Sequence, residues 1–324
     1  MRIEGPRVAR TAGVVSLRVG PWPSGLYAAR VTASGGRRGF APFVVTAGRK
    51  PRSRVVVVLP TNTWQAYNFR DADGNGVGDT WYADPSIPMV ELARPYMHGG
   101  VPPYRPGFMH WLERMRPRPD FMSDDDLDSV SSGESLLAAY DLVVFAGHEE
   151  YVTSHVYDVV TRYRDLGGNL AFLSSNTFFY RVRRVGSRLR RLGRWIDLGR
   201  VDARLTGVHY VGWNERRFPN RPYVATDVSV APWFFRGTGL EEGERFGSSY
   251  GVEIDQVSAD SPKDTIVLAR IPGLFGRGRS ATMTYYETAG GAKVFAAGAM
   301  NFDQPQSRVC WQLLTNLWRW MLRP

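Results

Sequence analysis

Cysteine is nearly absent from this chain: its 324 residues include one, Cys310. A single cysteine excludes an intrachain disulfide and any CxxC pair that would bind zinc or exchange disulfides. The apolar spacing around Cys310 predicts an amphipathic C-terminal helix, so we expect a packed core thiol here rather than a nucleophile. The N-terminal segment also lacks the apolar stretch of a signal peptide, and these absences together favour a reducing, cytoplasmic location.

Long hydrophobic runs are missing too. The longest apolar segments, residues 55–59 and 142–145, are as long as a strand, whereas a membrane-spanning helix needs about 18 apolar residues in succession. We therefore expect no membrane partner. An apolar content of 43% over this length is enough for a sizeable core, in one large domain or in a large and a small one.

Lysine is scarce, because only Lys50, Lys263 and Lys293 occur and the net charge of +10 comes almost entirely from arginine. The one dense arginine cluster, in residues 181–194, carries no recognisable nucleic-acid-binding motif. We favour a solvated, arginine-rich insertion and do not expect a nucleic-acid partner. A patch for a polyanion or an acidic partner is the alternative.

Short β segments dominate the first part of the chain. Alternating apolar residues and turn clusters predict strands at 14–19, 25–32 and 40–47, so residues 1–50 are expected to form a small β-sandwich-like segment. The pattern then changes to strand, loop, helix and strand. The expected buried strands are residues 54–59, the neighbours of Phe121, residues 142–146 and residues 169–174.

A helix separates the last two of these strands. Apolar residues at helical spacing run from 154 to 166, and Gly167-Gly168 ends the helix. A strand–helix–strand unit of this length implies a right-handed crossover and a parallel sheet. We therefore expect a doubly wound α/β domain over residues 51–324, with a β-rich insertion around 178–290. Strand 292–297 and helix 306–322 would close it, with the site at the carboxyl ends of the parallel strands.

Polar and ionisable residues crowd the ends of three predicted strands, at 59–68, 147–151 and 174–177. In the second segment, His148 and Glu150 lie two residues apart, which places both side chains on one side of an extended chain. One of the two can then bind a metal or water while the other takes a proton. For Glu149 we favour a cap on the following helix. For Glu150 alone, the cap and the site remain equal alternatives.

Several segments resemble a known family. They are, in chain order, WPSGLYAARV, TNTWQAYN, GHEEY, GGNLAFLSSNTFFYRVR and GGAKVFAAGAMNFD. Together they span nearly the whole chain and resemble the C-terminal catalytic domain of the N,N-dimethylformamidase large (beta) subunit, a metal-dependent amide hydrolase. The resemblance implies a doubly wound sheet like that of class I glutamine amidotransferases, without the cysteine nucleophile of those enzymes.

The resemblance also implies a metal centre, in which one iron(III) is held by two tyrosines and a glutamate, with water completing the shell. Tyr67 matches the first tyrosine and Glu150 the glutamate. Tyr96 is our choice for the second tyrosine, with Tyr82 and Tyr104 as alternatives. Phenolate and carboxylate oxygens suit a hard trivalent ion better than the His and Cys ligands of zinc do. Without a metal, Tyr67 would be a tyrosine that fills the edge of the core.

Three further residues match the lining of the family's site: His148, Asn176 and Glu287. His148 or Glu287 would move protons, and Asn176 would donate a hydrogen bond to the carbonyl oxygen as negative charge develops there. The expected activity is hydrolysis of a small linear amide. The expected partners are the small-molecule amide substrate and either a second copy of the chain or a small accessory subunit.

Residues 71–79 read D-x-D-x-N-G-x-x-D, so that Asp71, Asp73, Asn75 and Asp79 occupy the oxygen-ligand positions of a calcium loop. The twelfth position is Tyr82 rather than Glu, which argues against an EF-hand. The alternatives are a calcium loop without flanking helices and a polar Gly/Asp turn. A second acidic run, residues 124–126, is expected to start a helix or a solvated turn rather than to face the site.

A different class of function competes with the amide hydrolase. A non-catalytic or carbohydrate-handling module that keeps the fold would explain the many aromatic residues and the β-sandwich-like segment. The two hypotheses differ in the placement of Tyr67 and Glu150. Ligand bonds of about 2.0–2.2 Å put donor oxygens about 3 Å apart, so a metal site requires these two side chains to converge.

Overall fold

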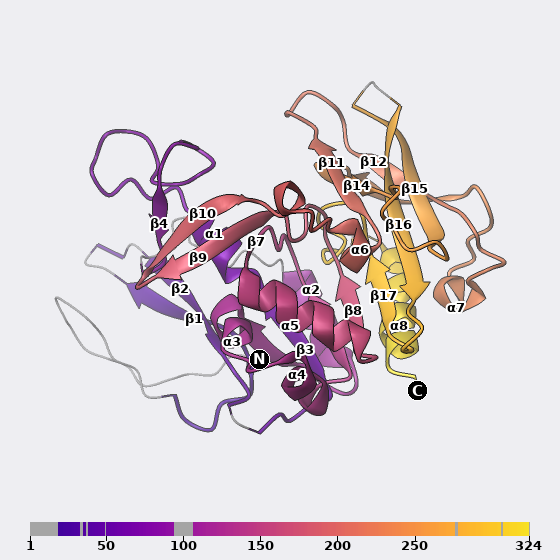
Figure 1. Cartoon of the computed structure of the whole chain (residues 1–324), viewed down its shortest axis with the longest axis horizontal. Coiled ribbons are helices and arrows are strands. Elements are labelled where there is room, and N and C mark those ends of the chain that lie inside the picture. Colours follow the sequence, from indigo (N-terminus) through magenta and orange to yellow (C-terminus); the bar gives the residue numbers. More distant parts are fainter. Residues whose placement is uncertain are drawn as a thin grey trace.

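The computed structural model describes residues 19–32, 35–36, 38–48, 50–93, 106–275, 278–305 and 307–323, and the statements below concern these residues. A mixed nine-stranded sheet forms the centre of the molecule, and helices lie on both of its faces (Figure 1). The spatial order of its strands is β13 (Arg245–Tyr250), β12 (Arg221–Ala225), β15 (Ile266–Leu274), β16 (Arg279–Glu287), β17 (Lys293–Ala296), β8 (Asn169–Phe172), β6 (Leu142–Phe145), β3 (Val55–Leu59) and β5 (Asp120–Ser123).

The helices are short, apart from two of twelve and fourteen residues. None of them, within the described ranges, is long and apolar enough to cross a membrane. Their bounds are α1 (Thr61–Ala66), α2 (Pro106–Arg114), α3 (Asp124–Asp128), α4 (Gly133–Ala139), α5 (Ser154–Asp165), α6 (Ala203–Thr206), α7 (Pro232–Phe235) and α8 (Arg308–Met321), with a 3-10 helix at η1 (Ile196–Leu198).

Strand β3 shows why helices cover both faces. All five of its residues are buried, and successive side chains point to opposite faces of a sheet. Val55 and Val57 pack in the core cluster that contains residues of α2 and α8, whereas Val56 and Val58 pack in the cluster with residues of α3, α4 and α5. A continuous apolar strand of this kind is therefore stable only between two layers of helices.

Five adjacent strands, from β17 to β5 in the spatial order, are parallel. The predicted strand–helix–strand unit is confirmed, because β6 and β8 pair in parallel on either side of α5 in the chain. An α/β fold is thus confirmed, but the sheet is not parallel throughout. Strands β12, β13, β15 and β16 join it antiparallel. They come from the β-rich region 178–290, whose turn-rich connections favour antiparallel neighbours.

Three smaller sheets flank the central one. The strand predicted at 25–32 is found with those bounds. The strand predicted at 40–47 is found at Arg38–Val45. Most of the strand predicted at 14–19 lies outside the described residues. The smaller sheets are β1 (Gly25–Thr32) with β2 (Arg38–Val45), β4 (Met89–Glu91) with β10 (Arg188–Arg194), β9 (Tyr180–Val185) and β7 (Tyr151–Thr153), and β11 (His209–Trp213) with β14 (Glu253–Gln256).

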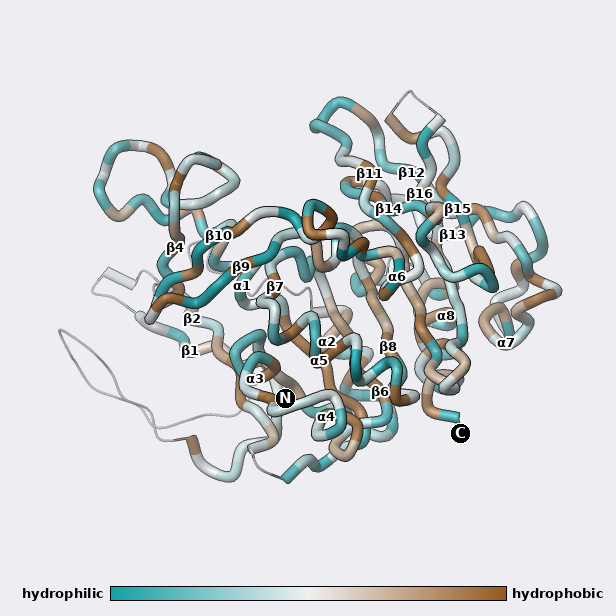
Figure 2. Tube along the Cα trace, viewed as in Figure 1, coloured by the Kyte–Doolittle hydropathy of each residue, from teal (hydrophilic) through white to brown (hydrophobic). Residues whose placement is uncertain are grey.

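The arginine-rich stretch 181–194 forms the hairpin β9–β10, which carries many hydrophilic residues in Figure 2, whereas β6 and β8 are mostly hydrophobic. Much of its charge is used within the fold. Arg184, Arg188 and Arg194 pair with carboxylates, and the Arg191 guanidinium lies 4.9 Å from the centre of the Tyr180 ring. These contacts agree with a solvated, structural insertion.

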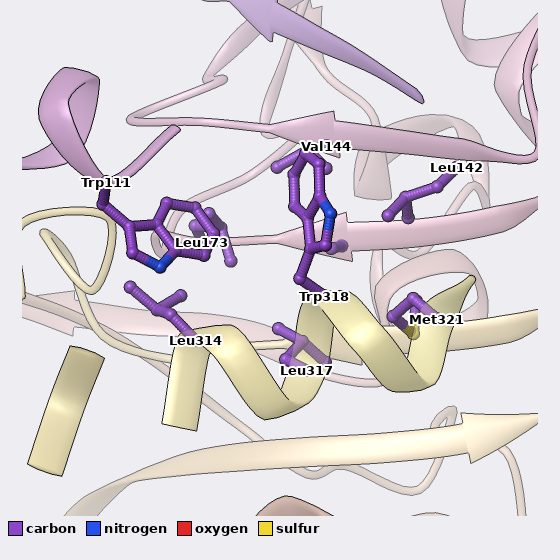
Figure 3. Close-up of a pocket in the computed structure, with 9 residues that line it drawn as sticks. Trp111, Leu142, Val144, Leu173, Leu314, Leu317, Trp318 and Met321 are labelled. Carbon is purple, nitrogen blue, oxygen red and sulfur yellow. The ribbon is translucent and has the colours of Figure 1, made fainter. Parts of the chain in front are cut away.

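Helix α8 packs on the parallel strands through one apolar face. Trp318 points from it toward Val144, and Leu314 lies beside Trp111 (Figure 3). The void among these side chains measures about 10 Å³, roughly the space of one water molecule, and its lining is apolar, so it is a packing defect rather than a ligand site. Cys310, in the same helix, is fully buried, which confirms the predicted core thiol.

Gly298, just after β17, offers a test of this packing. Its φ is +66°, and a Cβ added there would lie 2.0 Å from the carbonyl oxygen of Thr282. Gly291 also has positive φ, +83°, but no described atom lies within 4 Å of its added Cβ. Gly291→Ala should therefore cost about 1–2 kcal/mol through backbone strain alone. Gly298→Ala should cost at least about 2 kcal/mol more, because the Thr282 backbone must move. Urea unfolding measures both, and equal losses would contradict the close approach.

Candidate functional site

Three segments converge at the carboxyl edge of the parallel strands. Strand β3 leads into α1, and Tyr67 follows this helix directly. Strand β6 leads to His148 and Glu150, and β8 leads to Asn176. Because parallel strands end at the same edge of the sheet, these polar side chains meet although the segments are far apart in the chain.

Tyr67 and Glu150 are in direct contact. The Tyr67 hydroxyl donates a hydrogen bond to Oε2 of Glu150, 83 residues away in the sequence, and His148 Nε2 lies 3.0 Å from the same oxygen. The backbone of Glu150 is also fixed, since its N–H donates to the Thr63 hydroxyl and its carbonyl accepts from the N–H of Tyr180. Burial, together with the Glu150 carboxylate, raises the pKa of Tyr67 well above its usual value, so this phenol is neutral.

A second carboxylate completes the cluster, and the sequence analysis missed it. Glu253, in β14, accepts a hydrogen bond of 2.8 Å from Asn176 Nδ2 and lies 3.8 Å from His148 Nε2. Two residues further, Asp255 accepts a 2.8 Å hydrogen bond from the Asn176 backbone N–H. The available signal was the alternation Glu253-Ile254-Asp255, which places both acids on one face of a strand. We call His148, Glu150, Asn176 and Glu253, together with Tyr67, the strand-end cluster.

The electrostatics of the cluster follow from burying several acids together. Burial raises the pKa of Glu253 to about 7, although neighbouring His148 partly opposes the shift. Burial likewise raises the pKa of Asp255 to about 8. For His148, burial lowers the pKa, but the carboxylates of Glu253 and Glu150 outweigh it and raise the value to about 9. At neutral pH His148 is therefore a cation, and Glu253 exchanges its proton readily.

Two buried polar atoms of the cluster have no hydrogen-bond partner among the described residues: Nδ1 of His148 and Oδ1 of Asn176. Asn176 also has a φ of +53°, in the left-handed region that most residues avoid. Buried atoms without partners and strained backbone are both common at ligand-binding sites, where the ligand supplies the missing contact.

Of the remaining residues predicted to line the site, Glu287 lies elsewhere. Glu287 is at the opposite edge of the sheet, because it ends β16, pairs in register with Lys293 at the start of β17 and accepts a hydrogen bond from the Tyr285 hydroxyl. The structure does not bring it to the cluster, and the carboxylate beside His148 is Glu253 instead. Tyr96 and Tyr104 lie outside the described residues.

The interpretation of Glu149 as a helix cap is wrong. Strand β7 separates it from α5, and the side chain of Thr153 caps that helix. Glu149 is instead fully buried against Asp124, and burial together with that carboxylate raises the pKa of Glu149 well above its usual value. Asp124, whose pKa burial raises to about 6, accepts a hydrogen bond of 2.6 Å from the Asn62 N–H. The acidic run 124–126 does start a helix, capped by Ser123, as predicted.

The fold and the cluster define a class of protein: a mixed α/β chain with a tyrosine–carboxylate–histidine group at the ends of parallel strands. Within the described ranges, no group of three or more His, Cys, Asp or Glu side chains is placed to hold a metal ion.

The family described as "N,N-dimethylformamidase beta subunit-like, C-terminal" matches residues 14–305, most of the chain, and the chain belongs to this family. No curated protein matches it. Among solved structures, the chain is similar to "mmIFT52 N-terminal domain", at 13% identity and a TM-score of 0.38 over 67% of this chain and 91% of that one. A TM-score this low carries no argument about function.

The acidic loop 71–79 is held by its own backbone. Asp71 accepts hydrogen bonds from the N–H groups of Gly74 and Gly76, and Asp79 accepts from the N–H of Ala72. These contacts account for a polar turn without a cation. The calcium loop formed by Asp71, Asp73, Asn75 and Asp79 stays a prediction.

Calcium binding to this loop is expected to raise the melting temperature, because a ligand that binds only the folded state stabilises it. Asp73→Ala should abolish the rise. Since the twelfth position lacks a glutamate, we expect weak binding, and the thermal titration must extend to millimolar calcium. Magnesium at equal ionic strength is the control for screening. A melting temperature that calcium leaves unchanged would assign the loop to the polar turn.

Proposed function

We propose that this chain hydrolyses the C–N bond of a small linear amide, at a mononuclear iron(III) held by Tyr67, Glu150 and a second tyrosine, for which Tyr96 is the candidate. The observation that carries the proposal is the contact between the Tyr67 hydroxyl and the Glu150 carboxylate. The proposal includes a sheet like that of class I glutamine amidotransferases, supported by five parallel strands that place the cluster at their carboxyl ends.

The donor set of the cluster fits a hard cation. Tyr67 and Glu150 direct two oxygens at one point, and a proton now lies between them. The Tyr67 phenol keeps that proton because its anion would be buried beside Glu150, and a trivalent cation in its place would neutralise both oxygens. When bound, iron(III) supplies Lewis acidity, which polarises an amide carbonyl and favours deprotonation of water.

Two side chains of the cluster are suited to move the protons of hydrolysis. Glu253, with a pKa near neutrality, takes a proton from the water whose oxygen bonds to the carbonyl carbon. His148, which is protonated at neutral pH, gives a proton to the leaving nitrogen as the C–N bond breaks. The products are a carboxylic acid and an amine.

Asn176 acts in substrate positioning. Its Nδ2 orients the Glu253 carboxylate, so only the second hydrogen of that nitrogen remains to reach a carbonyl oxygen. Its Oδ1 is buried without a partner among the described residues and can accept a hydrogen bond from a substrate N–H or from water. Asn176 therefore links the base to the substrate.

The non-catalytic or carbohydrate-handling module is the weaker proposal. It predicts no convergence of Tyr67 with Glu150, and it gives no reason to bury Glu253 beside His148 at a cost in desolvation. The amide hydrolase explains both features, since a metal ligand and a general base must lie close to each other.

Iron content is the direct test. Protein produced with iron should contain about one iron per chain and absorb visible light, because a tyrosine phenolate bound to iron(III) gives a charge-transfer band. Glu150→Gln should abolish iron retention. Colourless, iron-free wild-type protein would remove the mechanism.

Glu149→Gln is the matched control, because it changes the neighbouring buried carboxyl and leaves the contact between Tyr67 and Glu150 unchanged. The neutral amide introduced by this substitution can donate to Asp124 as the protonated Glu149 does, so iron content should stay close to wild type. Equal iron loss in both variants would mean that Glu150 acts through the fold rather than as a ligand.

Glu253→Gln tests the base. If Glu253 must be ionised, the activity of the wild-type enzyme falls as the pH drops through the pKa of this group, at about 7, or lower where a nearby cation favours the carboxylate. Glu253→Gln should lower kcat by about 10²–10⁴-fold, retain iron and lose this acidic limb. A variant that keeps the limb at wild-type kcat would exclude Glu253 as the base.

A further inference from the structure

Tyr82 lies between the strand-end cluster and solvent. Its ring contacts the ring of Tyr67 edge-on, with centroids 5.6 Å apart, and its side chain is 46% exposed. The Phe69 ring, similarly exposed, contacts the Tyr82 ring with centroids 5.5 Å apart. Phe69 and Tyr82 therefore form one rim of the strand-end cluster, which is aromatic and in contact with water.

The other rim comes from the region 178–290. Trp213, at the end of β11, is the register partner of Glu253 and is 43% exposed. The chain then enters a loop, and from this loop Arg216 Nη2 donates a 3.0 Å hydrogen bond to the Tyr82 hydroxyl. This bond joins the two rims, which are 134 residues apart in the sequence.

Arg216 carries a positive charge that no carboxylate neutralises among the described residues. Its partner is the Tyr82 hydroxyl, whereas the neighbouring Arg217 pairs with the Glu215 carboxylate at 3.4 Å. Glu215 and Arg216 both have positive φ, +50° and +58°, and the side chain of Asn214 fixes the turn by accepting the Arg216 N–H at 2.9 Å. Two successive non-glycine residues in this conformation are strained, which is common where a loop presents a functional side chain.

The strand-end cluster already pairs its own cation. His148 lies 3.0 Å from the Glu150 carboxylate and 3.8 Å from that of half-buried Glu253. An anionic substrate group would compete there with these carboxylates, but at the rim it would meet the guanidinium of Arg216, whose planar fork matches a carboxylate.

We propose that Arg216 binds an anionic group of the substrate, so that the preferred substrates are small amides that carry a carboxylate a few bonds from the amide carbonyl. This inference rests on the proposed amide hydrolysis and names its substrate class. The Tyr82 hydroxyl holds Arg216 in place through Nη2. The other N–H donors of the guanidinium are then available to the substrate carboxylate.

Two formamides of equal shape test the proposal: N-formylglycine, which is anionic, and N-isobutylformamide, in which an isopropyl group replaces the carboxylate. The iron-loaded full chain should prefer the anion. Arg216→Gln should lower kcat/KM for N-formylglycine about tenfold or more and leave N-isobutylformamide within twofold, because a charge-assisted hydrogen bond is lost only with the anion. The preference should also shrink at high salt.

Arg217→Gln is the matched control, since it removes an adjacent exposed arginine that already has a carboxylate partner. It should leave both substrates unchanged. Equal effects of Arg216→Gln on the two formamides, or equal effects of the two variants on N-formylglycine, would overturn the proposal.

A separate measurement distinguishes this failure from failure of the proposed function. If wild-type protein hydrolyses neither formamide, the amidase proposal fails for these substrates, and calorimetric binding of N-formylglycine decides the role of Arg216. Binding that Arg216→Gln weakens at least tenfold supports an anion site at the rim. Binding that is absent, or the same in both proteins, overturns it.

Discussion

The site depends on the cost of burying carboxyl groups. An ionised carboxylate loses strong hydration when it leaves water, and it stays charged only where donors or cations replace that hydration. At the carboxyl edge of the parallel strands, Tyr67 and His148 supply donors to Glu150, and Asn176 supplies one to Glu253. Each donor is held in place by the acid that it stabilises, so removing one donor leaves that acid with fewer hydrogen bonds to replace its lost hydration.

The fold supports this arrangement through rigid strands. Residues 55–59 and 142–145 are fully buried between two helical layers, and their backbone ends are therefore fixed where the polar residues begin. Helix α1 starts directly after β3, with Asp124 accepting the Asn62 N–H in its first turn. That contact sets the direction in which α1 presents Tyr67.

The sequence allows one half of this site to be predicted. His148, Glu150 and Asn176 follow an apolar strand within a few residues, and Tyr67 follows β3 across the short helix α1. Local pattern and the rule for parallel strands therefore suffice to place them together. Glu253 follows no such strand. It reaches the cluster because β14 pairs with β11 and docks beside the edge. The alternation of Glu253 and Asp255 shows that the two acids share a face, but no local pattern predicts this long-range pairing. Glu287 has the same side chain, but antiparallel pairing of β16 with β17 carries it to the far edge.

The interpretation of Glu149 as a helix cap failed for a related reason. A three-residue strand, β7, lies between this acid and α5, and it pairs in parallel with β9. Because β9 belongs to the same β-rich region as β14, that region supplies both the backbone contact that fixes Glu150 and the carboxylate that faces His148. The region read from sequence as an insertion is therefore part of the strand-end cluster. Without it, the parallel strands would present Tyr67, His148 and Glu150 without the carboxylate of Glu253.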